Sequence, residues 1–290
     1  TQIVIGGRGF AKGQLEGPSD VALDAEGNLY VADTVNDRIQ KYDADGVFLA
    51  YAGGFGSDVK IEQPWSMTVA DDGTVFVAST WDHTILKLDK DLKQIDQWGA
   101  GGQLKDGDTD PFKLFGPREI TLAPSGNVLI TDTGNSRVVE YTADGEFVRQ
   151  FGSAGTSGEP LEFSEPVGIE VNAAGDIYIG DFWNKRVVVL DKDLHLKTTI
   201  PIDAWGSQAV SERAYMALLD DGRLLVTDPT NGKVLAFGPE GAAIASYDMP
   251  REGAQTFARP IGIATDGTSV YVADSAGNVV RKIPLAEIVP

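Results

Sequence analysis

The chain has 290 residues, of which 42% are hydrophobic, so it can bury a sizeable core in one or two domains. Its 24 basic and 43 acidic residues give a formal charge of −19, which repels phosphate backbones and argues against nucleic-acid binding. The absence of cysteine excludes disulfides, thiolate nucleophiles and cysteine-ligated zinc. No segment approaches the roughly 18 consecutive apolar residues of a membrane span.

A short motif recurs six times along the chain. Its first copy is "LYVADTVNDRI" at residues 29–39, and the later copies are "VFVASTWDHTI" (75–85), "VLITDTGNSRV" (128–138), "IYIGDFWNKRV" (177–187), "LLVTDPTNGKV" (224–234) and "VYVADSAGNVV" (270–280). The aligned positions Asp33, Ser79, Asp132, Asp181, Asp228 and Asp274 are separated by 46, 53, 49, 47 and 46 residues. A period of this size indicates a propeller or another repeat array.

Each unit predicts four short antiparallel strands. The first strand follows a proline, except in the fifth unit, where Arg213 stands at that position; the proline-led stretches are 18–23, 64–69, 117–122, 166–171 and 260–264. A glycine turn such as "DAEGN" leads into the motif strand, because glycine supplies the positive φ that a tight hairpin needs. A third strand such as "RIQKYD" and a fourth such as "VFLAYAGG" complete the unit.

Six such units without a helical period predict an all-β, six-bladed β-propeller of four-stranded antiparallel blades, formed by a single domain over residues 1–290. The sixth unit stops after three strands, near Ile283. The N-terminal "QIVIGG" is similar to the fourth strand of the other units. We therefore expect residues 2–6 to complete the last blade and close the ring, which removes an exposed sheet edge.

The units resemble NHL repeats. The resemblance is carried by "GPSDVALDAEGNLYVADTVNDRIQKYDADG" (17–46) and "GPREITLAPSGNVLITDTGNSRVVEYTADG" (116–145), with the proline, the glycine turn, the Asp-Thr-x-Asn-x-Arg turn and the aromatic residue of the third strand. It extends over all six units and is weaker in the second, fifth and sixth. It implies the propeller fold and leaves the function open, because similar blades occur in protein-binding, RNA-binding, sensor and lyase domains.

The repeated Asp-Thr-x-Asn-x-Arg turn is predicted to be structural. A single catalytic site would not be repeated around a ring, whereas a buried aspartate that accepts backbone N–H bonds holds a turn in each blade. Arg38, Arg137 and Arg186 are placed to bond nearby carboxylates or carbonyls. The asparagines of the turn are expected in the left-handed backbone region; they are Asn36, Asn135, Asn184 and Asn231.

Residues that depart from the repeat are the candidates for function. The second unit has Ser79, Trp81 and His83 in the turn, and the fourth has Phe182 and Trp183. We expect these turns to share a face with the loops that enter each first strand. The predicted ligand-binding residues on this face are Trp65, Trp81, Arg118, Glu119, Trp183 and Tyr215. Exposed aromatics beside hydrogen-bonding groups suit sugar rings or peptide side chains. In the alternative interpretation the tryptophans plug the channel or pack between blades.

Metal sites receive little support. Asp106, Asp108 and Asp110 have the alternate spacing of a calcium loop, but Pro111 and Pro117 replace the glycine and glutamate that an EF-hand needs, which favours a solvated acidic loop. The resemblance also covers amidating lyases, which use several zinc-binding histidines. Only His83 and His195 exist here, and we expect them on opposite faces.

Gluconolactonase-like propellers bind a divalent metal in the central channel through Glu, Asn and Asp. We find no glutamate in the equivalent early strand, and Asp20 is the nearest acid. We therefore expect no cofactor, and a channel metal remains an alternative.

The fifth unit departs from the NHL pattern at Asp203–Ser207, Ala214–Tyr215 and Asp228–Pro229. These stretches resemble NHL domains that follow a membrane region in bacterial glycosyltransferase-like proteins, which implies a tethered, extracytoplasmic or secreted domain. The leading hypothesis is a monomeric, non-enzymatic binding or scaffolding propeller for a protein, peptide or glycan. The alternatives are a metal-dependent hydrolase or lyase of the gluconolactonase-like type and a purely structural envelope module.

Overall fold

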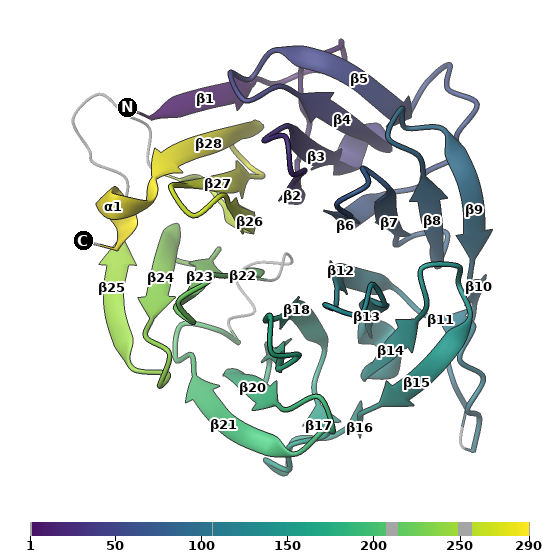
Figure 1. Cartoon of the computed structure of the whole chain (residues 1–290), viewed down its shortest axis with the longest axis vertical. Helices are drawn as coiled ribbons and strands as arrows, with labels where there is room; N and C mark the ends of the chain where they lie inside the picture. The colour runs from purple at the N-terminus through teal and green to yellow at the C-terminus, as the bar shows by residue number, and fades with distance from the viewer. Residues whose placement is uncertain (1, 106, 207–213, 249–256, 290) are drawn as a thin grey trace.

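The computed structural model describes residues 2–105, 107–206, 214–248 and 257–289, so Asp106, Ser207 and Arg213 lie outside the described part. Six four-stranded antiparallel sheets surround a central axis, which confirms the predicted six-bladed propeller (Figure 1). In the part of the chain that is described, no helix has the length and apolar character needed to cross a membrane.

The blades follow the chain in order, and each runs from an inner strand to an outer one. Blade 1 comprises β2 (Asp20–Leu23), β3 (Leu29–Asp33), β4 (Arg38–Tyr42) and β5 (Phe48–Gly53); blade 2 comprises β6 (Pro64–Val69), β7 (Val75–Ser79), β8 (Thr84–Leu88) and β9 (Gln94–Trp98). Blade 3 comprises β12 (Pro117–Leu122), β13 (Val128–Asp132), β14 (Arg137–Tyr141) and β15 (Phe147–Phe151); blade 4 comprises β18 (Pro166–Val171), β19 (Ile177–Asp181), β20 (Arg186–Leu190) and β21 (Leu196–Pro201). Blade 5 comprises β22 (Met216–Leu218), β23 (Leu224–Asp228), β24 (Lys233–Phe237) and β25 (Ala243–Tyr247); blade 6 comprises β26 (Pro260–Thr265), β27 (Ser269–Asp274), β28 (Val279–Pro284) and β1 (Ile3–Gly6).

The core lies between neighbouring blades. The second strands β3, β7, β13, β19 and β23 are buried along their whole length, because blades cover both of their faces, and they therefore read as continuous apolar runs. In the outer strands burial concentrates at the last residues, such as Trp98 of β9 and Phe151 of β15. The inner strands β2, β6, β12, β18, β22 and β26 contact one another in turn and line the channel.

The ring closes as the sequence predicts. Strand β1 pairs antiparallel with β28, with Ile3 opposite Lys282 and Gly6 opposite Val279. A single helical turn, α1 (Leu285–Ile288), follows β28 and was not expected, because four residues are too few to show a helical period. Two short parallel pairs also bridge adjacent blades: β10 (Ala100–Gly101) with β11 (Lys113–Leu114), and β16 (Ser153–Ala154) with β17 (Glu162–Phe163).

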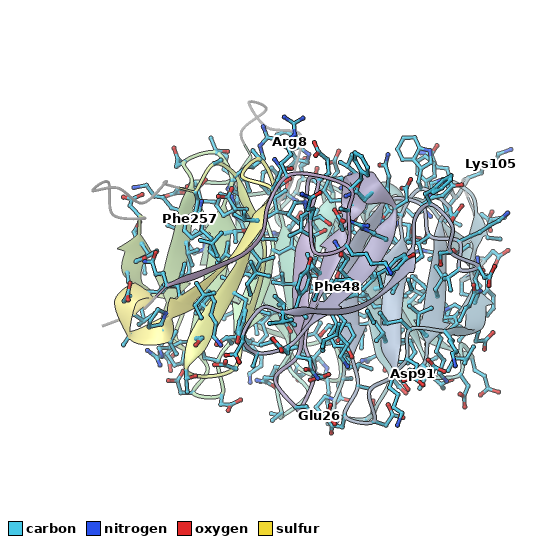
Figure 2. All side chains as sticks on the ribbon, turned by 90° about the horizontal axis from the view of Figure 1, so that it is seen from above. Arg8, Glu26, Phe48, Asp91, Lys105 and Phe257 are labelled. Carbon is cyan, nitrogen blue, oxygen red and sulfur yellow. The ribbon has the colours of Figure 1, made fainter. Side chains whose placement is uncertain are left out.

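The two faces of the disc carry different loops. We call the face with the turns between the second and third strands of each blade the Asp-turn face, and the opposite one the hairpin face. Figure 2 shows Arg8 and Lys105 on the Asp-turn face and Glu26 and Asp91 on the hairpin face. The loop that enters each inner strand lies on the Asp-turn face, because its backbone hydrogen-bonds the turn, as in Val35 N to Glu16 O at 3.2 Å.

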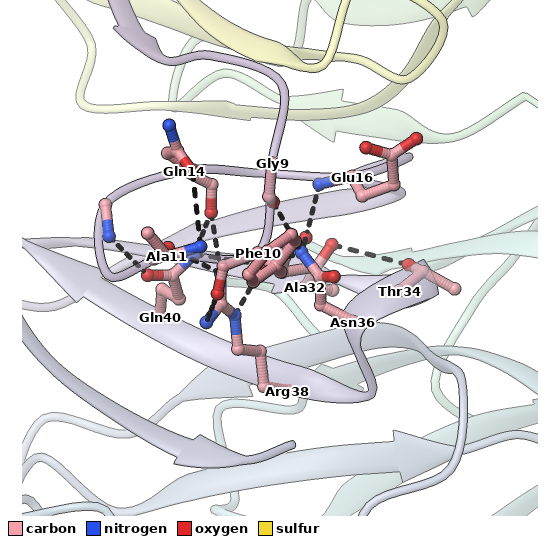
Figure 3. Close-up of polar contacts among 12 residues, drawn as sticks. Gly9, Phe10, Ala11, Gln14, Glu16, Ala32, Thr34, Asn36, Arg38 and Gln40 are labelled. Carbon is pink, nitrogen blue, oxygen red and sulfur yellow. Dashed lines mark hydrogen bonds and ion pairs between the residues drawn. The ribbon is translucent and has the colours of Figure 1, made fainter. Parts of the chain in front are cut away.

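Asp33 holds the turn of blade 1, as predicted, and Figure 3 labels its partners Glu16, Asn36 and Arg38. Its buried carboxylate accepts hydrogen bonds from the Glu16 backbone N–H at 2.7 Å and from Asn36 Nδ2 at 2.9 Å, and Arg38 Nε lies at 2.6 Å. The guanidinium of Arg38 also donates to the carbonyls of Phe10, Ala11 and Gln14. One buried ion pair thereby fixes both the turn and the preceding loop.

The same arrangement recurs in blades 3 and 4. Asp132 and Asp181 each pair with an arginine Nε at 2.8 Å, from Arg137 and Arg186. In blade 5, Lys233 pairs with Asp248 at the surface, and in blade 2 Ser79 and Thr84 replace the ion pair. Among the described residues, blades 2 and 5 therefore lack the buried Asp–Arg pair.

The expectation that the turn asparagines are left-handed is wrong. Asn36 and Asn135 lie in single 3-10 turns, η1 (Thr34–Asn36) and η2 (Thr133–Asn135), and use their side-chain amides to bond the aspartate. The residue that follows takes the positive φ, as in Asp37 (55°) and Ser136 (53°).

Removing one member of a buried ion pair leaves a buried charge without its partner, which costs about 3–5 kcal/mol. We expect Arg186→Met to lower the free energy of unfolding by about this amount in urea denaturation. The matched change in blade 2, Thr84→Val, should cost about 1 kcal/mol or less, because no buried charge is left behind. Equal costs at the two positions would contradict the role given to the ion pair.

Candidate functional site

A side chain that the sequence places on the rim crosses the central channel at the Asp-turn face. Tyr215 is 0% exposed, and its hydroxyl donates to the carbonyl oxygen of Trp65 at 3.3 Å. The two residues come from blades 5 and 2, on opposite sides of the ring (Figure 1). The Tyr215 side chain therefore spans the channel and links blade 5 to blade 2. The expectation that Tyr215 is exposed is wrong.

Glu119 also differs from its expected place on the rim. It lies in the inner strand β12 at 6% exposure and points into the channel, where its Oε2 accepts a hydrogen bond from the Ile169 backbone N–H at 2.5 Å. It shares a cavity of about 190 Å³ with Asp20 of β2 and the half-buried Glu170 of β18. The inner strands thus hold two glutamates, which corrects the expectation that Asp20 is the nearest channel acid.

The surroundings of these carboxyl groups favour their protonated forms. None of the described residues that line the cavity is basic. Burial raises the pKa of Asp20 to about 7, and burial together with the charge of Asp20 raises the pKa of Glu170 to about 8. Burial, with the charges of Glu170 and Asp20, also holds the pKa of Glu119 well above its usual range. Each group is destabilised in its charged form because little water or positive charge is near.

The channel does not have the arrangement of a metal centre. Across the described ranges, no three acidic or histidine side chains are placed so that they could hold one metal ion. Glu119 uses one carboxylate oxygen on Ile169 N, and Asp20 accepts from Met67 N at 3.2 Å. A channel metal of the gluconolactonase type therefore does not fit these residues. Asp108 of the predicted acidic loop pairs with Lys113 at 2.6 Å, and Asp106 lies outside the described residues.

An open pocket of about 580 Å³ lies on the Asp-turn face between blades 2 and 3. Two exposed aromatic side chains line this pocket. Trp81, in the turn of blade 2, is 66% exposed, and Phe115, in the loop before β12, is 38% exposed. The remaining lining residues are Thr80, His83, Gly116, Arg118, Thr133, Gly134 and Glu165. This pocket is the candidate binding site, because it combines exposed aromatic rings with a few polar groups.

Hydrogen bonds to the turns fix the walls of the pocket. Asp132 accepts from the backbone N–H of Phe115 at 2.7 Å, and His83 Nδ1 accepts from Gly116 N at 3.0 Å. The rings of His83 and Phe115 lie 5.3 Å apart. Phe115 also packs directly on Gly134, where an added Cβ would come within 2.4 Å of the ring. The position of Phe115 therefore depends on the aspartate turn and on a glycine in that turn.

Glu165 occupies an unusual backbone conformation in the pocket. The residue before the strand-leading proline has a left-handed φ in four blades: Gly17 (56°), Gln63 (43°), Gly116 (63°) and Glu165 (51°). Glycine takes this conformation without strain, whereas a residue with a Cβ pays roughly 1 kcal/mol or more. Blade 4 thus has a glutamate at the position where blades 1 and 3 have glycine.

The other predicted site residues are divided between neighbouring positions. The guanidinium carbon of Arg118 lies 3.9 Å from the ring centroid of Trp65, which borders a second pocket of about 410 Å³ between blades 1, 2 and 6. Trp183 packs against Phe182, with ring centroids 5.4 Å apart, at the edge of the core of blades 4 and 5. The structure therefore brings together Trp81, Arg118 and Trp65, and leaves Trp183 and Tyr215 in packing roles.

Sequence reasoning missed Phe115 and Glu165, although a signal for both was present. The two residues before the proline read Glu16-Gly17, Glu62-Gln63, Phe115-Gly116, Ser164-Glu165 and Ala258-Arg259 in the aligned units. Phe115 is the aromatic member of the first position, and Glu165 is the acidic member of the second. Departures from the repeat at these two positions would have pointed to the pocket.

Comparisons with known proteins agree with the architecture. The family model of the NHL repeat matches residues 15–42 and 163–190, in blades 1 and 4. Human NHL repeat-containing protein 3 is 25% identical over 303 residues, covering 93% of this chain and 80% of the relative. Rat peptidylglycine alpha-amidating monooxygenase is 27% identical over 241 residues, covering 77% of this chain but only 24% of that enzyme. The solved gluconolactonase from Xanthomonas campestris superposes with a TM-score of 0.65 at 14% identity, over 93% of this chain and 86% of that chain, which shows a shared fold alone.

The raised pKa values of the channel acids make stability depend on pH in a defined direction. The folded state binds protons that the unfolded chain has already lost above pH 4, so this contribution to stability falls as pH rises from about 4 to about 8. We expect Asp20→Asn to stabilise the protein relative to wild type by about 2–3 kcal/mol more at pH 8 than at pH 5. Chemical denaturation at the two pH values measures the difference.

The control is Asp91→Asn, which removes one carboxylate from an exposed position on the hairpin face. Its stability relative to wild type should be the same at both pH values. A pH-independent effect of Asp20→Asn would show that Asp20 is charged in the folded protein.

Proposed function

We propose that this chain, a six-bladed β-propeller built from NHL repeats, is a non-catalytic binding module that captures a protein, peptide or glycan in the pocket of Trp81 and Phe115. The observation that carries the proposal is the 66% exposure of the Trp81 indole at the edge of a preformed pocket. An exposed indole loses favourable burial in the free protein and recovers it when a ligand covers the ring.

The polar groups of the pocket suit recognition. Thr80 and Thr133 donate their hydroxyls to the carbonyls of Pro117 and Pro166 in the next blades, so they hold the framework of the pocket. His83 is held by Gly116, and Arg118 lies against Trp65. Among the described residues that line the pocket, no nucleophile has a neighbouring base. These features support a rigid surface that binds without chemical conversion of its ligand.

Capture by the pocket is tested by comparing two tryptophans. Trp81→Ala should abolish binding of a ligand found in a screen of peptides and glycans, and should leave the melting temperature within about 2 °C, because the removed ring is largely exposed. Trp183→Ala should lower the melting temperature by several degrees, because its ring packs against Phe182, and should leave the affinity nearly unchanged. Thermal shift and isothermal titration measure both effects.

Binding that survives in Trp81→Ala but is lost in Trp183→Ala, with the fold intact, would assign the site to blade 4. Binding that survives in both variants would remove the Asp-turn aromatics from the proposal.

The enzyme alternative is tested by metal. Burial raises the pKa values of the channel carboxyl groups, and no three of the described acidic or histidine side chains are placed to hold one metal ion. Addition of calcium or zinc at about 1 mM, and removal with a chelator, should therefore each move the melting temperature by less than about 1 °C. A rise of several degrees with one metal, reversed by chelator and lost in Glu119→Gln, would instead support a metal-dependent hydrolase or lyase.

A further inference from the structure

We propose that His83 is a pH-sensitive switch in the pocket of Trp81 and Phe115. The neutral imidazole holds one wall of the pocket in place, and protonation in mild acid releases that wall. This regulation rests on the proposed function, because it acts on the same pocket. Three observations support it: the hydrogen bond that His83 accepts, the same contact in two other blades, and the packing of His83 against Phe115.

The hydrogen bond fixes the protonation state of the ring. His83 is half-buried in the turn of blade 2, and its Nδ1 accepts the backbone N–H of Gly116 at 3.0 Å. A backbone N–H can only donate, so Nδ1 carries no proton in this arrangement and the ring is neutral, with its proton on Nε2. An imidazolium carries a proton on both nitrogens and accepts nothing. The protonated ring and this position of Gly116 therefore exclude each other.

The position of His83 has the same task in two other blades. In blade 1 Asp37 accepts the backbone N–H of Gln63 at 2.8 Å, and in blade 6 Asn278 accepts that of Gly17 at 2.9 Å. Each donor is the residue immediately before the leading proline of the next blade, and each acceptor has a left-handed φ of 55° to 58°. Asparagine and an ionised aspartate keep their acceptor oxygens between pH 5 and pH 8, whereas histidine is the side chain that ordinarily changes its charge there. Blade 2 thus makes a shared structural contact with a titratable group.

The contact controls the wall of the pocket. The rings of His83 and Phe115 lie 5.3 Å apart, and the Phe115 backbone N–H is held by Asp132 at 2.7 Å. Two successive amides of the loop are therefore anchored on two blades, Phe115 on blade 3 and Gly116 on blade 2. Loss of the second anchor loosens the loop beside the Phe115 ring while the aspartate turn stays closed. The pocket is therefore assembled at neutral pH and loosened in acid.

The charged groups around His83 are of both signs. Acids favour a protonated ring and bases oppose it. The ring packs on Gly101 of β10, which carries no charge. The charged groups of the surrounding elements are Glu62 before β6, Asp82 in the same turn, Lys113 of β11, Arg118 of β12 and Glu165 before β18. These groups act on the ring in opposite directions, whereas the bond to Gly116 is made by one protonation state only.

Nitrogen-15 NMR of protein labelled at histidine tests the protonation state. The chain has two histidines, and His195 is the internal reference, because its Nδ1 faces the carboxylate of Asp191 at 3.1 Å and donates there. At pH 8 we expect His83 to carry its proton on Nε2 and to show a bare Nδ1. His195→Asn assigns the two sets of signals. A proton on Nδ1 of His83 at pH 8 would overturn the proposal.

Amide hydrogen exchange at Gly116 measures release of the wall. The observed rate is divided by the intrinsic rate at each pH. An imidazole freed from the bond is protonated about 30 to 1 at pH 5, so the corrected exchange rate should rise by up to about 30-fold between pH 8 and pH 5. The ring resonances of Phe115 should change over the same pH range, because the ring contacts His83.

Two variants hold the switch in one state each. His83→Asn introduces the residue that blade 6 has at this position, which accepts the bond and does not titrate, so the corrected Gly116 exchange should agree within about 3-fold at the two pH values. His83→Lys introduces the residue of blade 4, Lys185, which is charged and accepts nothing. It should show the released wall at pH 8 as well as at pH 5. His195→Asn should keep the wild-type response.

The outcomes separate this inference from the proposed function. Equal corrected exchange at pH 8 and pH 5 in the wild type, or a wild-type response in His83→Asn, would overturn the switch. Release of Gly116 with unchanged Phe115 resonances would overturn its control of the pocket. None of these measurements needs a ligand, so capture that survives Trp81→Ala removes the proposed function and leaves the exchange result intact. Trp81-dependent capture that is equally tight at both pH values removes the switch alone.

Discussion

The buried aspartate that occupies the turn of every blade except blade 2 is the contact on which both the fold and the pocket depend. In blades 1, 3 and 4 its carboxylate accepts the backbone N–H of the residue two positions before the leading proline: Glu16, Phe115 and Ser164. A single side chain thereby fixes the end of one strand and the start of another. The asparagine and arginine of the same turn complete its hydrogen bonds, which a buried carboxylate requires.

This contact explains how a repetitive ring can display different side chains in the same place. The N–H that bonds the aspartate belongs to the backbone, so the side chain of that residue is free to vary without loss of the turn. Blade 3 uses the freedom to present Phe115, while blade 1 presents Glu16. The structural residues and the recognition residues of the loop are therefore neighbours in the chain, yet change independently.

The fold could be predicted from the sequence because each blade repeats the same local signals. Glycine turns, continuous apolar second strands and the Asp-Thr-x-Asn-x-Arg turn agree with one another in several units, and such agreement between local preference and topology specifies a single fold. The closing strand could be predicted as well, because residues 2–6 match a missing fourth strand and complete the pairing with β28.

The site could be predicted only in part. The inner strands of blades 2, 3, 4 and 6 have an irregular register after their first proline, for example between Pro117 and Ile120. A bulge of this kind changes which face a side chain takes, so alternation along the sequence does not reveal that Arg118 stays on the Asp-turn face while Glu119 enters the channel. The tie between Tyr215 and Trp65 joins residues 150 positions apart, and no local pattern encodes it.

The closure of the ring has a mechanical consequence. Strand β1 runs antiparallel to β28, so Ile3 and Lys282 lie opposite each other at the end of the pair from which both chain termini leave (Figure 1). A force that pulls the two termini apart acts in the unzipping geometry, so it breaks the hydrogen bonds between β1 and β28 one after another. In the shear geometry the same bonds would carry the force together. The propeller therefore opens first at this seam when its two termini are pulled apart.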